Sequence, residues 1–105
     1  MITFRMSDHR IFSPEKLKKN NLAETPNLFV DLYCLEPGQE QKPHRHTGSD
    51  KIYIVLEGRG RFRVGSEESD LENGLGVLAP SGEEHAVRNA TNDPLVLLVM
   101  MAPKP

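Results

Sequence analysis

The sequence predicts an all-β protein. Its 105 residues include eight glycines and eight prolines, which are scattered along the chain and indicate many turns. Turn-forming clusters recur roughly every ten residues, a spacing typical of an antiparallel sandwich or barrel. Three of the segments between these turns are almost entirely apolar. We therefore expect short strands over most of the chain rather than a bundle of helices.

One short helix is expected near the N-terminus. Ser13 supplies a hydroxyl cap and Pro14 occupies the first helical position, a combination that favours a helix start. The residues that follow, 17–21, are short and polar, so the helix is limited to two turns before Pro26. Everything after this point is predicted to be strand and turn.

Three predicted strands are apolar on both faces. In a half-buried strand apolar and polar residues alternate, whereas a strand covered on both sides is apolar throughout. The strands of this kind are 28–35, which only Asp31 interrupts, 52–56 and 95–101. Because so small a domain has little material to cover both faces, we expect a second subunit to do so and predict a homodimer.

Charge and composition exclude several classes of protein. The 13 Lys and Arg nearly balance the 15 Asp and Glu, for a net charge of −2, which favours neither a nucleic acid nor a membrane as partner. The single Cys34 excludes an internal disulfide and a multi-cysteine metal site. With no targeting segment and no span of membrane length, we expect one domain, 1–105, in the cytoplasm.

Three of the four histidines are spaced as metal ligands. His44 and His46 lie two residues apart, so in a strand both imidazoles project from the same face. His85 follows a turn 39 residues further on. Three neutral imidazoles that converge inside a small barrel would bind a divalent first-row metal. By itself the His-x-His pair is better explained as two surface histidines on a half-exposed strand, and His9 is expected at the surface.

The residues around these histidines form two spaced motifs. The first, 38–58, runs from Gly38 through His44 and His46 to Gly58, and the second, 74–89, contains Gly74, Pro80, Gly82, His85 and Asn89. This pattern resembles the two conserved motifs of the cupin superfamily. The resemblance implies a double-stranded β-helix, or jelly-roll barrel, that is commonly dimeric and holds a metal in its cavity. In this interpretation Asn89 bonds to backbone within the barrel wall.

The chain departs from the family pattern at one ligand. Metal-binding cupins carry a glutamate where this sequence has Lys51, and Asp50 is adjacent. Alternation turns Asp50 away from the face that Lys51 and Tyr53 share, unless a bulge restores it. Three outcomes stay open: the histidines bind metal alone, Asp50 completes the site, or Lys51 projects inward and favours an anion over a dication. A simpler alternative is that Lys51 extends to solvent at the start of its strand.

The remaining polar residues are weighed against simpler roles. Lys51 and Tyr53 are the candidate catalytic groups, as a base and as a donor, although Tyr53 also suits an ordinary strand position. The arginines at 59, 61 and 63 alternate with Phe62, so we expect them in solvent and Phe62 in the core. Cys34 is expected to be a small core residue.

The sequence thus predicts a small cupin with a divalent metal (Mn, Fe, Ni, Cu or Zn) held by His44, His46 and His85, with Asp50 as an alternative fourth ligand. Its partner would be a small polar or anionic molecule that the protein binds or transforms. The alternative is a non-enzymatic or metal-free binding or sensing module that holds a small anion near Lys51. The family's reactions are diverse, and nothing in the sequence selects one.

Overall fold

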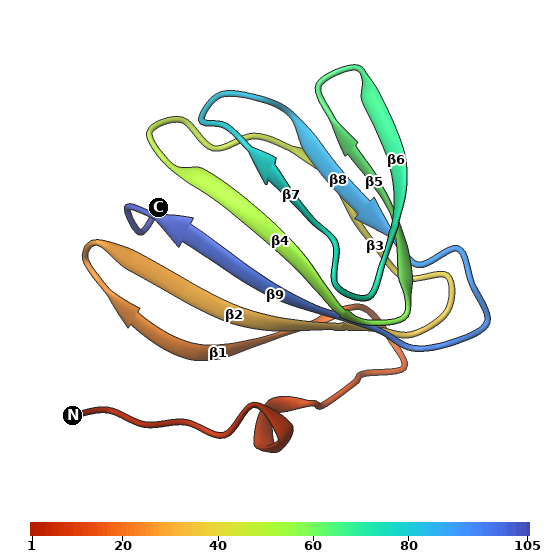
Figure 1. Cartoon of the computed structure of the whole chain (residues 1–105), viewed down its shortest axis with the longest axis horizontal. Helices are drawn as coiled ribbons and strands as arrows, with labels where there is room; N and C mark the ends of the chain where they lie inside the picture. Colours follow the sequence, from red (N-terminus) through yellow and green to blue (C-terminus); the bar gives the residue numbers. More distant parts are fainter.

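The computed structural model describes residues 1–105 and confirms the all-β prediction. Nine strands form two antiparallel sheets that face each other as a jelly roll (Figure 1). No helix is long and apolar enough to cross a membrane. The strands are β1 (Lys18–Thr25), β2 (Leu28–Leu35), β3 (Glu40–His44), β4 (Asp50–Glu57), β5 (Arg59–Val64), β6 (Glu67–Glu72), β7 (Gly76–Ala79), β8 (His85–Arg88) and β9 (Leu95–Ala102).

The two sheets bring distant segments together. The five-stranded sheet has the order β1-β2-β9-β4-β7, and the four-stranded sheet has the order β3-β8-β5-β6. The pairing of β3 with β8 sets His44 directly opposite His85, although the two are far apart in sequence. In the other sheet β4 pairs with β9, and Lys51 is opposite Met101. The site residues therefore come from both sheets.

The predicted N-terminal helix is wrong in place and type. The only helical element is a 3-10 turn, Met6–His9, and residues 18–25 form strand β1. Ser13 does accept a hydrogen bond from the Glu15 N–H, at 3.3 Å, but the bond closes only a local turn. Pairing with β2 decides the structure, because as a strand this segment buries Asn20 and Leu22 on one face. A short polar helix would bury almost nothing there.

Apolar side chains form two clusters, one on each side of the five-stranded sheet. The cluster between the sheets contains Tyr33, Leu35, Tyr53, Val55, Phe62, Val87, Leu95, Leu97 and Val99. The cluster on the outer face contains Leu22, Val30, Leu32, Cys34 and Val96, with Met6 and Phe12 packed against it. The prediction of cover on both faces is confirmed for β2, part of whose outer cover is the chain's own N-terminal segment. On the outer face of β4 and β9, Ile52, Ile54 and Met100 are only half-buried. Cys34 is fully buried, as expected.

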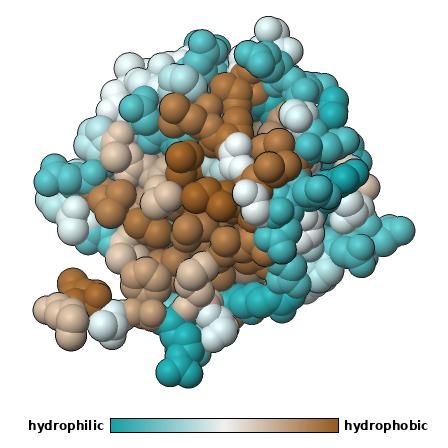
Figure 2. Space-filling model, in the orientation of Figure 1, coloured by the Kyte–Doolittle hydropathy of each residue, from teal (hydrophilic) through white to brown (hydrophobic).

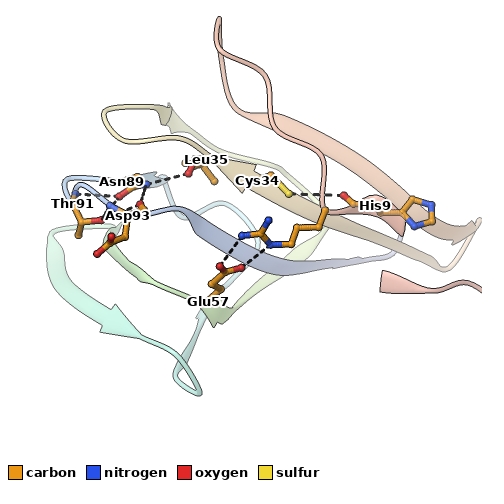
Figure 3. Close-up of polar contacts among 8 residues, drawn as sticks. His9, Cys34, Leu35, Glu57, Asn89, Thr91 and Asp93 are labelled. Carbon is orange, nitrogen blue, oxygen red and sulfur yellow. Dashed lines mark hydrogen bonds and ion pairs between the residues drawn. The ribbon is translucent and has the colours of Figure 1, made fainter. Parts of the chain in front are cut away.

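Three polar contacts fasten the N-terminal segment to the sheet, two of which are drawn in Figure 3. The Arg10 guanidinium donates two hydrogen bonds to the Glu57 carboxylate, at 2.7 and 2.8 Å. The Cys34 thiol lies 3.9 Å from the His9 carbonyl oxygen, and the Asn20 side-chain amide donates to the same oxygen at 2.8 Å. The segment before β1 is thus held in place over the outer cluster.

Asn89 fulfils the role expected of it. Its side chain is fully buried and makes four hydrogen bonds (Figure 3). The amide Nδ2 donates to the carbonyls of Leu35, at 3.1 Å, and Asp93, at 2.8 Å. The amide Oδ1 accepts from the backbone N–H and the hydroxyl of Thr91. These bonds join the turn after β8 to the end of β2.

The arginine stripe also faces as predicted. Phe62 is buried between the sheets, whereas the arginines of β5 lie on the outer face of the four-stranded sheet. They pair with acidic residues of the same face: Arg59 with Glu72, Arg61 with Glu68 and Asp70, and Arg63 with Glu84. Arg59 and Arg61 are exposed and Arg63 is half-buried, and none of the three guanidinium groups lies between the sheets.

Candidate metal centre

The fold brings the three predicted histidines together. His44 ends β3, His46 follows in the loop, and His85 begins β8 opposite His44. One ring nitrogen from each lies within 4.8 Å of the other two. The ring centres of His44 and His85 are 4.1 Å apart, and those of His46 and His85 are 5.6 Å apart. Three imidazoles from two strands and a loop therefore point at one place.

Hydrogen bonds to the backbone orient two of these rings. The Nδ1 of His44 lies 2.8 Å from the Lys42 carbonyl oxygen, and the Nδ1 of His85 lies 3.0 Å from the Glu83 carbonyl oxygen. A carbonyl only accepts, so each Nδ1 carries the proton and each Nε2 keeps its lone pair. Such outer contacts orient the ligating histidines of metal sites.

The Nε2 of His85 shows that this donor set fits a metal. It is buried and has no hydrogen-bond partner in the protein. A buried polar atom without a partner is costly, and native proteins rarely keep one without a reason. A divalent ion shared with His44 and His46 would satisfy it. Imidazole nitrogen is a good ligand for Zn, Cu, Fe and Ni.

Burial keeps these imidazoles neutral. Desolvation lowers the pKa of His85 to about 4, and the nearby Lys51 and the other two histidines act in the same direction. Desolvation also lowers the pKa values of His44 and His46, with Lys51 again contributing. A neutral imidazole is the form that binds metal. The trio is therefore ready to bind a cation near pH 7 without first losing protons.

Lys51 projects into the site rather than to solvent. Its side chain is 1% exposed, and its Nζ lies 3.3 Å from the Gln41 Oε1 and 3.4 Å from the His44 Nε2. The Tyr33 hydroxyl is also 3.4 Å away. Burial, together with repulsion from Lys19, lowers the pKa of Lys51 to about 7. The site thus contains an amine where metal-binding cupins are expected to carry a carboxylate.

Asp50 does not join the histidines. It is exposed, and its carboxylate accepts a hydrogen bond from the Ser81 N–H at 2.9 Å. The register of β4 against β9 runs without a bulge from Asp50 to Val55, so the shift that would turn Asp50 inward is absent. Asp50 instead holds the turn that precedes His85.

Tyr53 belongs to a buried polar cluster beside the histidines, formed by Tyr33, Gln41, Lys51 and Tyr53. The Tyr53 hydroxyl donates to the Gln41 Oε1 at 2.7 Å, and burial raises the pKa of this phenol. The Gln41 Nε2 lies 3.4 Å from the Tyr33 hydroxyl. Burial raises the pKa of Tyr33 to about 12, so both phenols keep their protons.

Tyr33 and Gln41 were not predicted as site residues. Tyr33 lies in an apolar strand, and Gln41 precedes the register shift of β3, so neither carries a local signal. Tyr33 and Asp31 lie two residues apart on β2, so both side chains project from the same face. The polar Asp31 within an apolar strand is the only sign in the sequence that this face contains polar groups. Both residues gain a role only when the two sheets face each other.

A cavity of about 470 Å³ lies elsewhere, between the β5–β6 hairpin and β7. Phe62, Val64, Leu71 and Val77 line it, and none of the three histidines does. Glu83, whose backbone carbonyl orients His85, is at its edge. The carboxylates that line the cavity, Glu67, Glu68 and Glu83, are exposed, whereas the three histidines converge within 4.8 Å, so we take the histidine cluster as the candidate site.

Comparison with known proteins agrees with the fold. A family model described as "Cupin domain" matches residues 31–101. An uncharacterized protein of Streptomyces coelicolor is 35% identical over 80 residues, which are 74% of this chain and 73% of that protein. A protein of Thermotoga maritima named "Oxalate-binding protein" is 29% identical over 81% of this chain and 69% of its own. The crystal structure of TT1209 from Thermus thermophilus superposes over the full length of both chains with a TM-score of 0.96 and 43% identity. The chain belongs to the cupin family.

Proposed function

We propose that this cupin binds a divalent transition metal (Mn, Fe, Ni, Cu or Zn) through His44, His46 and His85 and holds a small anionic molecule beside it. The buried, unpartnered Nε2 of His85 carries the proposal, because a divalent ion shared with the two other imidazoles would satisfy its lone pair. When bound, the metal would act as a Lewis acid or an oxygen-activating centre.

The residues around the histidines support an anion as the second component. Lys51 offers a positive charge within 3.4 Å of the His44 Nε2. The Tyr33 hydroxyl oxygen accepts from Lys51 and Gln41, which leaves its own proton free for a ligand. A carboxylate matches both groups. The relative from Thermotoga maritima is named for binding oxalate, a small carboxylate, and this supports the same class of ligand.

Metal analysis of protein purified without an affinity tag tests the metal. We expect one ion per chain after reconstitution. His85→Ala should reduce this to a small fraction, because the remaining two imidazoles make a weak site. His9→Ala is the matched control, since His9 lies outside the trio. No stoichiometric metal in the wild type would refute the proposal, and full retention in His85→Ala would refute this ligand set.

A second candidate is an anion-binding cupin without metal. The observation that favours it is the 3.4 Å approach of the Lys51 Nζ to the His44 Nε2, since an ammonium there opposes a dication. Lys51→Glu separates the two functions. If the native site depends on metal, Lys51→Glu should bind metal more tightly and bind anions more weakly. If the native protein binds anions equally well in a chelator, the metal-free function is the correct one.

We also propose that the protein is a homodimer through the outer face of the five-stranded sheet. Figure 2 shows apolar side chains gathered on one face of the molecule, over β4 and β9. The N-terminal segment covers the neighbouring outer cluster but leaves Ile52, Ile54 and Leu78 partly exposed, the last by 54%. Ile54→Lys should yield a monomer by light scattering, and Ser66→Lys, in the β5–β6 turn, should not. A monomeric wild type would refute the dimer.

A further inference from the structure

Two lysines flank one aromatic ring beside the candidate metal centre. Lys19 on β1 is the register partner of Tyr33 on β2, so both side chains project from the same face of the sheet. The Lys19 Nζ is 5.6 Å from the centre of the Tyr33 ring. The Lys51 Nζ is 5.3 Å from the same centre. The site therefore has a second cation, which lies on a strand outside both cupin motifs.

Neither lysine has an acidic partner. The seven ion pairs of the chain involve other basic residues: Arg10, Arg45, Arg59, Arg61, Arg63 and Lys104. A solvated lysine needs no counter-ion, and Lys19 is exposed. Lys51 is buried, and an unpaired buried cation is strongly unfavourable. An anion from outside the protein would supply the missing charge.

One acid lies on the same face. Asp31 is buried, and its carboxylate accepts a hydrogen bond from the Asn21 amide at 3.0 Å. It makes no ion pair with either lysine, so it neutralises neither by contact. This end of the site combines two amines, three imidazoles and one carboxylate. The imidazoles are neutral, so the positive charge comes from the two amines and from a divalent ion held by the histidines. With that ion in place, an anion with more than one negative charge would balance the site.

We propose that the ligand is a small dicarboxylate, with one carboxylate at Lys51 and the Tyr33 hydroxyl and the other at Lys19. Both nitrogens lie close to one ring centre, so they are no more than about 11 Å apart. A contact of about 3 Å at each amine leaves at most about 5 Å between the two carboxylates. That span admits acids of two to four carbons and excludes longer extended ones. The inference rests on the proposed function, since it uses the same site.

Lys51 and Lys19 have different tasks in this arrangement. Lys51 is buried next to the histidines and contacts the carboxylate nearest to them. Lys19 is exposed on an outer strand and contacts only the far carboxylate, so it distinguishes diacids from monoacids. Asn21, Asp31 and Tyr33 lie on the same face of β1 and β2 as Lys19. Specificity for the second acid group thus comes from a residue that makes no contact with the candidate metal ligands.

Calorimetric titration with defined acids tests the proposal. We expect malonate and succinate to bind the metal-reconstituted protein at least tenfold more tightly than acetate or adipate. Lys19→Met should lower succinate affinity about tenfold and leave acetate unchanged, whereas Lys19→Arg should retain most of the preference. Lys18→Met is the matched control, because Lys18 precedes Lys19 on β1 and its side chain projects from the opposite face. Lys51→Met should weaken both acids.

Each outcome decides a separate claim. Equal binding of acetate and succinate by the wild type, or unchanged succinate affinity in Lys19→Met, would overturn the dicarboxylate inference. Absence of any binding by these acids would overturn it as well. If the protein holds no metal but keeps the succinate preference and its dependence on Lys19, the metal proposal fails and the inference stands. Circular dichroism of each variant verifies that it is folded.

Discussion

Replacing Lys51 with methionine should make the protein more stable. Lys51 is 1% exposed, and its amine is surrounded by neutral groups at 3.3–3.4 Å. Methionine has a similar length and shape but no charge to desolvate. Buried charges replaced by well-fitting apolar side chains often leave a protein as stable or more so. Lys51 is therefore expected to serve ligand binding at the expense of stability.

The size of this effect follows from the lysine's pKa. A lysine with a pKa of about 7, rather than the usual value of about 10.4, destabilises the folded state by about 4 kcal/mol at pH 7. Its long hydrogen bonds return about 1 kcal/mol, which Lys51→Met loses. The net gain is about 3 kcal/mol. For a chain of this size it corresponds to a rise in Tm of roughly 10–20 °C.

The pH dependence identifies the cause. Because the folded-state pKa is depressed, the folded protein binds the proton less tightly than the unfolded chain does. The penalty is complete below pH 7, shrinks as the pH rises from about 7 to about 10.4, and is absent above that range. The advantage of Lys51→Met should shrink in the same way.

Urea unfolding of chelator-treated protein between pH 6 and pH 10 measures this difference, and the chelator removes any contribution from bound metal. Lys18→Met is the control, because Lys18 is exposed and should change stability little. If Lys51→Met is no more stable than the wild type at pH 7, or if its advantage does not depend on pH, the desolvation of Lys51 is not the dominant effect.

Three further predictions concern the scaffold. Asn89→Ala removes four buried hydrogen bonds and leaves the Leu35 carbonyl without its side-chain donor, so we expect a loss of about 2–4 kcal/mol in urea unfolding; a loss no larger than that of Asn92→Ala would contradict this. Burial raises the pKa of Asp31, so its carboxylate destabilises the fold as the pH rises above about 3.9, and Asp31→Asn should be more stable at pH 7 but not at pH 3. Burial also raises the pKa of the Cys34 thiol, which should react with a thiol reagent only after unfolding; rapid reaction of native protein would show that the N-terminal segment opens readily.

The parts of the site that could be predicted share one property: their geometry is local. The spacing of His44 and His46, and the turn that re-aims the chain before His85, depend on a few neighbouring residues. Strand alternation likewise separates Lys51 from Asp50, and the unbroken register of β4 keeps them on opposite faces. Such features depend on the period of a strand and need no knowledge of what lies across the barrel.

The parts that could not be predicted depend on pairing between strands. The Ser13-Pro14 pair is a genuine local helix signal, but the pairing of β1 with β2 overrides it. Because the sequence favours a short helix here, it does not predict that Lys19 lies beside Tyr33. That contact requires residues 18–25 to form a strand. The contact of Gln41 with Tyr33 depends on the register shift within β3. Long-range pairing of this kind leaves no trace in a single sequence.

The glycine that ends the first motif shows why some motif positions are stringent. Gly58 has a φ of +85°, and a Cβ at this position would collide with the Pro94 carbonyl oxygen. Both the conformation and the close approach require glycine. This position keeps the turn after β4 tight against the start of β9.

Anomalous diffraction from crystals of the reconstituted protein tests the central claim most directly. We expect a single strong peak within bonding distance of the Nε2 atoms of His44 and His85 and of one ring nitrogen of His46, at about 2.0–2.1 Å for a zinc ion. Asp50 should remain hydrogen-bonded to the Ser81 N–H, as it is here. A metal ion ligated by Asp50, or no anomalous peak among the three histidines at saturating metal, would contradict the account.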